Sequence, residues 1–177
     1  MERTAEESQV IKALRKSHGF TLIELLIVIV ILAILAAVVV PQFTTSTNDA
    51  RLAAADTTLG NLRSAIDIYF AQHGEYPSRN GDGTNAANNP LAFVWQLSRY
   101  TDAAGDAALS PDATHVYGPY IKKEEIPLEP MTQLQTLIID SASTALGMTA
   151  DGGDPGGWKF NNQTGQLIIN HSTWEAR

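Results

Sequence analysis

Chemistry in this chain concentrates at one junction, where a polar leader meets a long apolar run. Gly19 and Phe20 form the junction, and Glu24 is a lone carboxylate just inside the apolar segment. A charged group at the bilayer centre costs about 2.5 to 3.5 kcal/mol on insertion scales and is rarely kept without a role. A cut between Gly19 and Phe20 would place a new α-amine four residues from Glu24, at a helix end that itself favours negative charge. A carboxylate tolerated near the end of the span is the alternative.

The apolar run is long enough to cross a membrane. Of the 21 residues from Phe20 to Val40, only Thr21 and Glu24 are polar. As a helix the run reaches roughly 31 Å, which matches a hydrocarbon core of about 30 Å. A cleaved secretory signal is the competing interpretation, but its apolar region has only about 7 to 15 residues. We therefore expect one membrane-spanning helix.

Charges beside the run predict its orientation. Lys12, Arg15 and Lys16 precede it, whereas Asp49 and Arg51 beyond it nearly cancel. Positive flanks stay in the cytoplasm. We expect the leader to be cytoplasmic and the chain after Pro41 to lie outside.

The junction resembles that of the type IV pilin and type II secretion pseudopilin family. Members carry a basic leader that ends in glycine, then Phe-Thr-Leu-Ile-Glu and an unbroken apolar helix. The matching residues here are Gly19, Phe20, Thr21, Leu22, Ile23 and Glu24, followed by the apolar run and Pro41. The resemblance also reaches the downstream turn at residues 74–77 and the stretch at residues 118–127, where it is close to the major pseudopilins.

This resemblance implies processing and assembly. A prepilin peptidase would cut after Gly19 and methylate the amine of Phe20. Glu24 would then meet the amine of a neighbouring subunit during assembly, and Pro41 would belong to the same assembly helix. The implied partners are the peptidase, identical and other pilin-like subunits, an inner-membrane assembly platform, and membrane lipid before assembly.

The length and composition fit a small exported domain attached to a long helix. Removal of 19 leader residues from 177 leaves 158, of which about 100 follow the first helix and suffice for one domain. The leader holds four basic and three acidic residues, so the remaining chain has eight basic and 16 acidic side chains. This excess of acidic side chains does not provide the basic surface that nucleic-acid binding requires.

The chain has no cysteine, so no disulfide holds the exported domain. Many type IV pilins of the resembled family have a disulfide near the carboxyl end, and its absence favours a pseudopilin. Calcium is another way to hold such a domain. Asp151 and Asp154 lie in a glycine-rich acidic loop that could approach calcium, but they lack the alternating ligands of an EF-hand. A solvated loop is the alternative.

Beyond Pro41 the pattern predicts that the helix continues to about Gln72. Apolar residues recur every three or four positions and form one stripe: Leu52, Ala55, Leu59, Leu62, Ile66 and Tyr69. Gly74 supplies a stop for the helix. Pro41 removes a helical amide donor and should bend the helix.

The remaining chain predicts a small antiparallel sheet with loops. Pro90 opens a short helix that continues to Tyr100, and residues 103–112 and 117–130 read as loops, the second packed on the sheet. Residues 134–140 favour a strand, with a helix over residues 131–146 as the alternative. Residues 158–160 and 166–170 form a hairpin across an asparagine-rich turn.

No residue pattern indicates an enzyme. His73, His115 and His171 are scattered and lack metal-binding spacing, and no Gly-x-Ser-x-Gly elbow is present.

Taken together, the elements above predict an α+β, pilin-like fold. The expected divisions are a leader at 1–19, a membrane and polymerisation helix at 20–41, and an amphipathic helix with a globular domain at 42–177.

The predicted function is that of a structural subunit of a type II secretion pseudopilus that supports protein export. A type IV pilus subunit for adhesion, motility or DNA uptake is the alternative within this class. A monomeric membrane-anchored binding protein or enzyme that keeps its leader is the alternative outside it. The predicted location is the bacterial inner membrane, single-pass, with the carboxyl-terminal domain periplasmic or extracellular, and then a filament.

Overall fold

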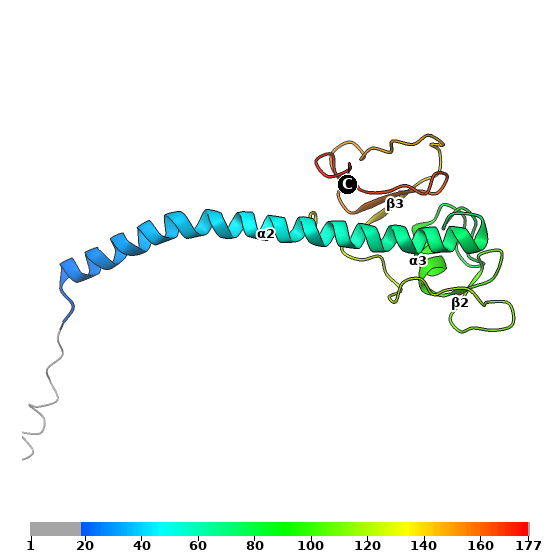
Figure 1. Ribbon diagram of the computed structural model, residues 1–177, viewed down its shortest axis with the longest axis horizontal. Helices are drawn as coiled ribbons and strands as arrows, with labels where there is room; N and C mark the ends of the chain where they lie inside the picture. Colours follow the sequence, from blue (N-terminus) through cyan, green and yellow to red (C-terminus); the bar gives the residue numbers. More distant parts are fainter. Residues whose placement is uncertain (1–18, 177) are drawn as a thin grey trace, which may run out of the picture. The chain divides into compact units, whose positions relative to one another are not determined.

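A computed structural model describes residues 19–176 of the chain, which form two compact units. The first unit ends at Ser46 and the second runs from Thr47 to Arg177. Along the chain the elements are α2 (Leu22–His73), α3 (Pro90–Ser98), β1 (Tyr100–Thr101), β2 (Ala107–Ala108), β3 (Leu137–Asp140), β4 (Trp158–Asn161) and β5 (Leu167–Ile169) (Figure 1). This α+β arrangement confirms the predicted fold class.

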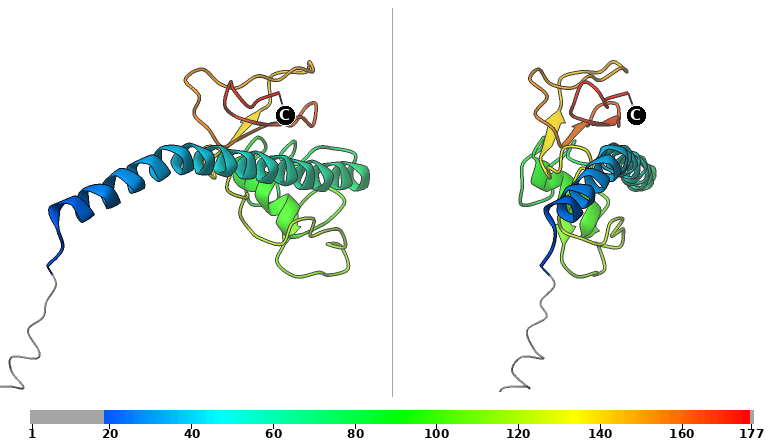
Figure 2. Two further views of the ribbon diagram at one scale, coloured as in Figure 1. Left: turned by 60° about the vertical axis from the view of Figure 1, so that its left-hand side comes forward. Right: turned by 90° about the vertical axis from the view of Figure 1, so that its left-hand side faces the viewer.

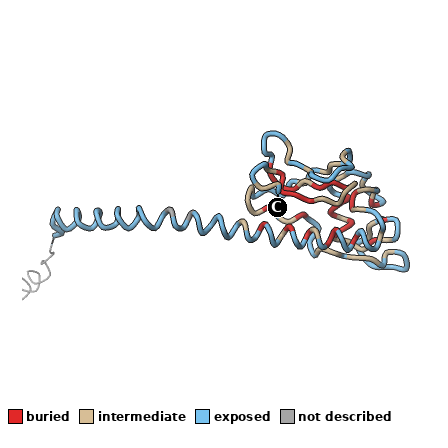
Figure 3. The backbone as a smooth tube through the Cα atoms, turned by 45° about the horizontal axis from the view of Figure 1, so that its top comes forward, coloured by how far each residue is buried: buried red, intermediate tan, exposed pale blue. Residues whose placement is uncertain are grey.

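The first unit contains the amino-terminal half of α2. Its large apolar side chains are exposed along the whole segment from Phe20 to Val40, as the pale blue tube in Figure 3 shows. Among residues 19–176, α2 is the one helix long and apolar enough to cross a membrane, and its most apolar stretch is not buried at all. The backbone is helical through Pro41, whose side chain lies outside the described residues. The bend predicted at Pro41 stays a prediction.

The second half of α2 supplies one wall of the core of the second unit. Five residues of the predicted stripe, Ala55, Leu59, Leu62, Ile66 and Tyr69, are buried, whereas the sixth, Leu52, is only partly buried. The helix ends where predicted. Gly74 adopts a positive φ of 72°, and its amide donates to the carbonyl of Phe70 at 2.8 Å.

The main sheet is mixed rather than wholly antiparallel. β4 and β5 form the predicted antiparallel hairpin, in which Phe160 lies opposite Leu167. β3 joins the other edge of β4 and runs parallel to it, with Leu137 opposite Trp158. A parallel neighbour needs a long connection, and residues 141–157 provide it. The alternative of a helix over residues 131–146 is wrong.

Two smaller expectations also change. The predicted loop 103–112 contains β2, which pairs with β1 through Thr101 and Ala107. The first part of the predicted loop 117–130 packs on the end of α3, because the amides of Tyr120 and Ile121 both donate to the carbonyl of Leu97. Its later part contacts the sheet as predicted, since Trp158 Nε1 of β4 donates to the carbonyl of Pro127 at 2.7 Å. In both views of Figure 2 the yellow-to-red chain that forms the sheet gathers apart from most of the green loops.

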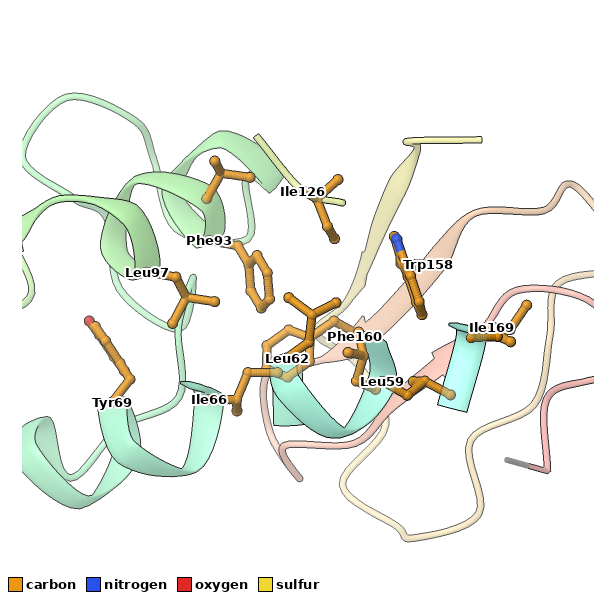
Figure 4. Packing of buried hydrophobic residues seen from close by; sticks show 13 residues of the cluster. Leu59, Leu62, Ile66, Tyr69, Phe93, Leu97, Ile126, Trp158, Phe160 and Ile169 are labelled. Carbon is orange, nitrogen blue, oxygen red and sulfur yellow. The ribbon is translucent and has the colours of Figure 1, made fainter. Parts of the chain in front are cut away.

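The core lies where α2, α3 and the sheet meet. Trp158, Phe93 and Phe160 are its largest fully buried side chains, and the Phe93 and Phe160 ring centroids are 4.8 Å apart. Leu59 and Leu62 of α2 point toward these rings in Figure 4. Apolar burial of this kind is the main stabilising term of a small domain.

Buried amide side chains connect the loops of this cysteine-free unit. Gln96 accepts from the amide of Ser78 at 2.6 Å and donates to the carbonyls of Gly81 and Gly105, each at 3.1 Å. Asn162 donates to the carbonyl of Ser78 at 3.0 Å. Both side chains are about 1% exposed, so their hydrogen bonds satisfy backbone groups that water does not reach.

Candidate processing and assembly site

The helix α2 begins with a reciprocal cap between Thr21 and Glu24. The Thr21 amide and hydroxyl both donate to Glu24 Oε2 at 2.8 Å, and the Glu24 amide donates to Thr21 Oγ1 at 3.3 Å. Thr21 stands just before the first helical residue, Leu22. This is a capping box, in which two side chains satisfy the free amide groups of a helix start.

The predicted cleavage point lies immediately before this cap. Gly19 and Phe20 are non-helical and exposed, and the Phe20 side chain is 79% exposed. A Cβ added at Gly19 would meet no atom within 4 Å. The fold of the described chain therefore places no demand for glycine at this position. A requirement for Gly19 would have to come from another molecule that binds the junction.

Glu24 stands among apolar side chains that have no cover in the described chain. Leu25 and Ile27 are more than half exposed, and so are most of the apolar residues up to Val40. An apolar helix exposed over its full circumference requires either lipid or other helices around it. Glu24 is the one acidic residue in this stretch, so any packing of the stretch must also accommodate a carboxylate.

The two aspartates considered for calcium take donors from the protein itself. Asp151 Oδ1 accepts from Lys159 Nζ at 2.7 Å, and Asp151 Oδ2 accepts from Asn170 Nδ2 at 3.1 Å. The hydrogen bond from Lys159 is the main reason why the pKa of Asp151 is lowered. Asp154 accepts from the amide and hydroxyl of Ser172, which lowers its pKa in the same direction. Among the described residues, no group of three metal-binding side chains forms.

The three histidines considered for catalysis lie in separate local contacts. The His73 ring stacks on Tyr69 with centroids 3.9 Å apart, and its Nε2 lies 3.0 Å from Thr101 Oγ1. His115 Nδ1 lies 2.8 Å from Asp112, and the His171 ring lies against Trp174. The structure therefore gives each histidine local neighbours and does not bring the three rings together.

The reasoning from sequence missed the roles of two residues, Thr21 and Lys159. The role of Thr21 had a readable signal, because Thr21 and Glu24 follow the spacing of a capping box. Lys159 had no such signal, because its partner Asp151 comes from the irregular connection between β3 and β4.

Comparisons with known proteins find relatives of this chain. Residues 14–40 match the family model described as the prokaryotic N-terminal methylation motif. A fimbrial protein of Neisseria meningitidis is 47% identical over 73 residues, which make up 41% of this chain and 43% of that protein. The resemblance to type IV pilins is thereby confirmed for the amino-terminal part of the chain.

Secretion proteins are also similar to this chain. Type II secretion system core protein G of Pseudomonas aeruginosa is 42% identical over 91 residues, 49% of this chain and 63% of that protein. Core protein G of Vibrio cholerae is 40% identical over 67 residues, 38% of this chain and 46% of that protein. The matched parts thus cover between 43% and 63% of these three relatives. No solved structure matches the chain.

Proposed function

We propose that the chain is a pilin-like structural subunit that is cut after Gly19 and assembles into a type II secretion pseudopilus. One observation carries the proposal. An exposed junction at Gly19 and Phe20 is followed at once by a capped helix whose apolar side chains have no cover over 21 residues, Phe20 to Val40. Lipid would cover this helix before assembly, and neighbouring helices would cover it in the filament.

Processing would change the charge at the head of the helix. Cleavage between Gly19 and Phe20 would create an α-amine one residue before the Thr21 cap, and methylation by the peptidase would leave that amine able to carry its charge. Glu24 would then pair with the amine of a neighbouring subunit. Because both charges lie in an apolar surrounding, an unpaired copy would be costly, and pairing would fix the register between helices.

The proposed topology places the leader in the cytoplasm. Lys12, Arg15 and Lys16 precede the helix and would remain on the cytoplasmic side. Residues 20–41 would form the membrane and polymerisation segment, and residues 42–177 would form an amphipathic helix and globular domain in the periplasm or outside the cell. An inner-membrane assembly platform would extract the subunit from the lipid.

Two observations support a pseudopilus over a surface pilus. The chain has no cysteine for a carboxyl-terminal disulfide. The match to core protein G of Pseudomonas aeruginosa also covers a larger share of both chains than the match to the meningococcal fimbrial protein. Deletion of the gene should therefore reduce protein secretion. Surface fibres without a secretion defect would favour the type IV pilus instead.

Intact mass and amino-terminal sequencing of the protein from its native membrane test the proposal directly. A chain that starts at N-methylated Phe20 is the expected result. A chain that retains residues 1–19 would overturn the proposal and favour a monomeric anchored protein. A Gly19→Ala precursor provides the matched control, because the added Cβ meets nothing in the described fold and only recognition by the peptidase should suffer.

A further inference from the structure

One dipeptide of the second unit is chemically labile. Asn80 followed by Gly81 is the sole Asn-Gly pair in the sequence. In such a pair the main-chain nitrogen of the glycine can attack the side-chain carbonyl of the asparagine, because glycine has no Cβ to obstruct the approach. Whether the attack occurs in a folded protein depends on the local structure.

The loop leaves both reacting groups available. The Asn80 side chain is exposed, in a bend between α2 and α3. Across residues 19–176, no hydrogen bond uses the Asn80 side chain or the Gly81 amide. Only the carbonyls of the two residues are engaged, by Gln96 Nε2 at 3.5 Å and 3.1 Å.

The other asparagines differ from Asn80 in ways that protect them. Asn48 and Asn61 lie within α2. Asn161, Asn162 and Asn170 are buried, and each side chain is hydrogen-bonded. Asn85, Asn88 and Asn89 are hydrogen-bonded through their side chains to Asp82, Asn162 and Leu91 respectively.

Gly81 cannot easily be exchanged for a residue that would protect Asn80. A Cβ at Gly81 would lie 2.7 Å from the carbonyl oxygen of Asn85. That oxygen accepts from the Asp82 amide at 3.1 Å and closes the turn. The fold therefore demands glycine at the position that makes Asn80 labile.

We propose that Asn80 is a spontaneous modification site, at which the folded chain converts to aspartate or isoaspartate. The Gly81 nitrogen loses its proton and bonds to Asn80 Cγ, and ammonia leaves to give a cyclic imide. Water then opens the imide at either carbonyl. The sum is asparagine plus water giving a carboxylic acid plus ammonia, and the formal net charge of the full chain changes from −7 to −8.

The isoaspartate product disturbs the buried connection at Gln96. In isoaspartate the main chain runs through the side-chain carbon of residue 80, which adds one methylene before Gly81. Gln96 holds Ser78, Gly81 and Gly105 together, so a longer path from Ser78 to Gly81 displaces at least one of these contacts. The modification therefore weakens the hydrogen bonds that hold this loop as the protein ages. This inference does not depend on the proposed function.

The test is peptide mapping by mass spectrometry after incubation of the full chain in detergent micelles at mildly alkaline pH. The folded chain should convert measurably at residue 80, because neither the Asn80 side chain nor the Gly81 amide has to break a hydrogen bond before it reacts. The rate should rise with hydroxide concentration. Enzymatic methylation of isoaspartate would distinguish the two products.

Two variants make the outcome decisive. Asn80→Gln should abolish the conversion, since glutamine cannot form the five-membered ring, and Asn61→Gln within α2 should leave it unchanged. Conversion in urea but not in the folded chain would overturn the proposal, and so would equal conversion of Asn80→Gln. After ageing, hydrogen exchange at the Ser78 amide should increase in wild type and stay constant in Asn80→Gln.

Discussion

Thr21 and Glu24 hydrogen-bond to each other in both directions, so the carboxylate in the apolar helix has donors from its own chain. Both donors from Thr21 reach the same oxygen, Oε2. Within residues 19–176 the other oxygen, Oε1, accepts no hydrogen bond. Glu24 thus combines a cap for its own helix with an oxygen directed to no described donor.

The first prediction concerns the hydroxyl of Thr21. Thr21→Ala should reduce filament yield several-fold, because Glu24 loses the side-chain half of its cap, which is worth about 0.5 to 2 kcal/mol. Thr21→Ser keeps the hydroxyl and should assemble like wild type. Filament yield from sheared cells measures both. Equal yields from Thr21→Ala and Thr21→Ser would show that the cap has no part in assembly.

The second prediction concerns the charge of Glu24. Glu24→Ala should permit membrane insertion and cleavage but strongly impair polymerisation, because the amine of the neighbouring subunit loses its partner. Glu24→Gln preserves most of the shape without the charge and should fail similarly. Cell fractionation and amino-terminal sequencing check the early steps, and microscopy checks the filaments. Normal filament yield from either variant would contradict the assembly role.

The third prediction concerns the packing of α2 on the sheet. Leu62→Ala should lower the free energy of unfolding by about 2 to 5 kcal/mol, because it opens a cavity beside buried rings. Leu62 is 2% exposed. Ile68→Ala on the opposite side of α2 is the control. Because the Ile68 side chain is 51% exposed, this change should lower the free energy of unfolding only slightly. Urea unfolding in micelles, followed by tryptophan fluorescence, measures both; equal losses would contradict this assignment of faces.

The fourth prediction concerns the ion pair of Asp151 and Lys159. Lys159→Met should destabilise the connection 141–157, because the Lys159 ammonium also donates to the carbonyl of Thr149 at 2.9 Å. In a double-mutant cycle with Asp151→Asn, we expect a coupling energy of about 0.5 to 3 kcal/mol. Lys122→Met, at an exposed lysine, is the matched control. Additive losses in the cycle would contradict the coupling.

The same pair gives a pH dependence of known sign. The folded-state pKa of Asp151 is lowered from its ordinary value of 3.8. Its contribution to the free energy of unfolding is therefore complete above pH 3.8 and disappears as the pH falls through the lower pKa of the folded state. Hydrogen exchange of the connection should therefore rise only in strong acid. In Asp151→Asn this acid response should be weaker.

Sequence reasoning succeeded where a local pattern decides the structure. The stripe from Ala55 to Tyr69 and the stop at Gly74 follow from spacing and from glycine's access to positive φ. The hairpin of β4 and β5 follows from apolar runs around a turn. For the site, the roles of Gly19, Phe20 and Glu24 stay predictions that rest on a contiguous motif.

The same reasoning failed where the structure depends on contacts between residues that are far apart in the sequence. β3 runs parallel to β4, and the connection between them is held by contacts such as Asn161 to the carbonyl of Ser143 and Gln166 to the amide of Gly147. Those partners are far apart in sequence and follow no period. β2 is made of two alanines, which carry little strand preference.

Two of the three largest core side chains come late in the chain, and the third, Phe93, belongs to α3. Trp158 and Phe160 belong to β4, and Leu167 and Ile169 follow in β5. If the leader stays in the cytoplasm and the chain beyond Pro41 crosses the membrane in sequence order, the apolar stripe of α2 emerges early and stays partly uncovered until these strands arrive. Transport of the carboxyl terminus then becomes the step that commits the chain to folding. A chain truncated or stalled before Trp158 would leave part of the apolar face of α2 exposed, which would make it a substrate for chaperones and proteases.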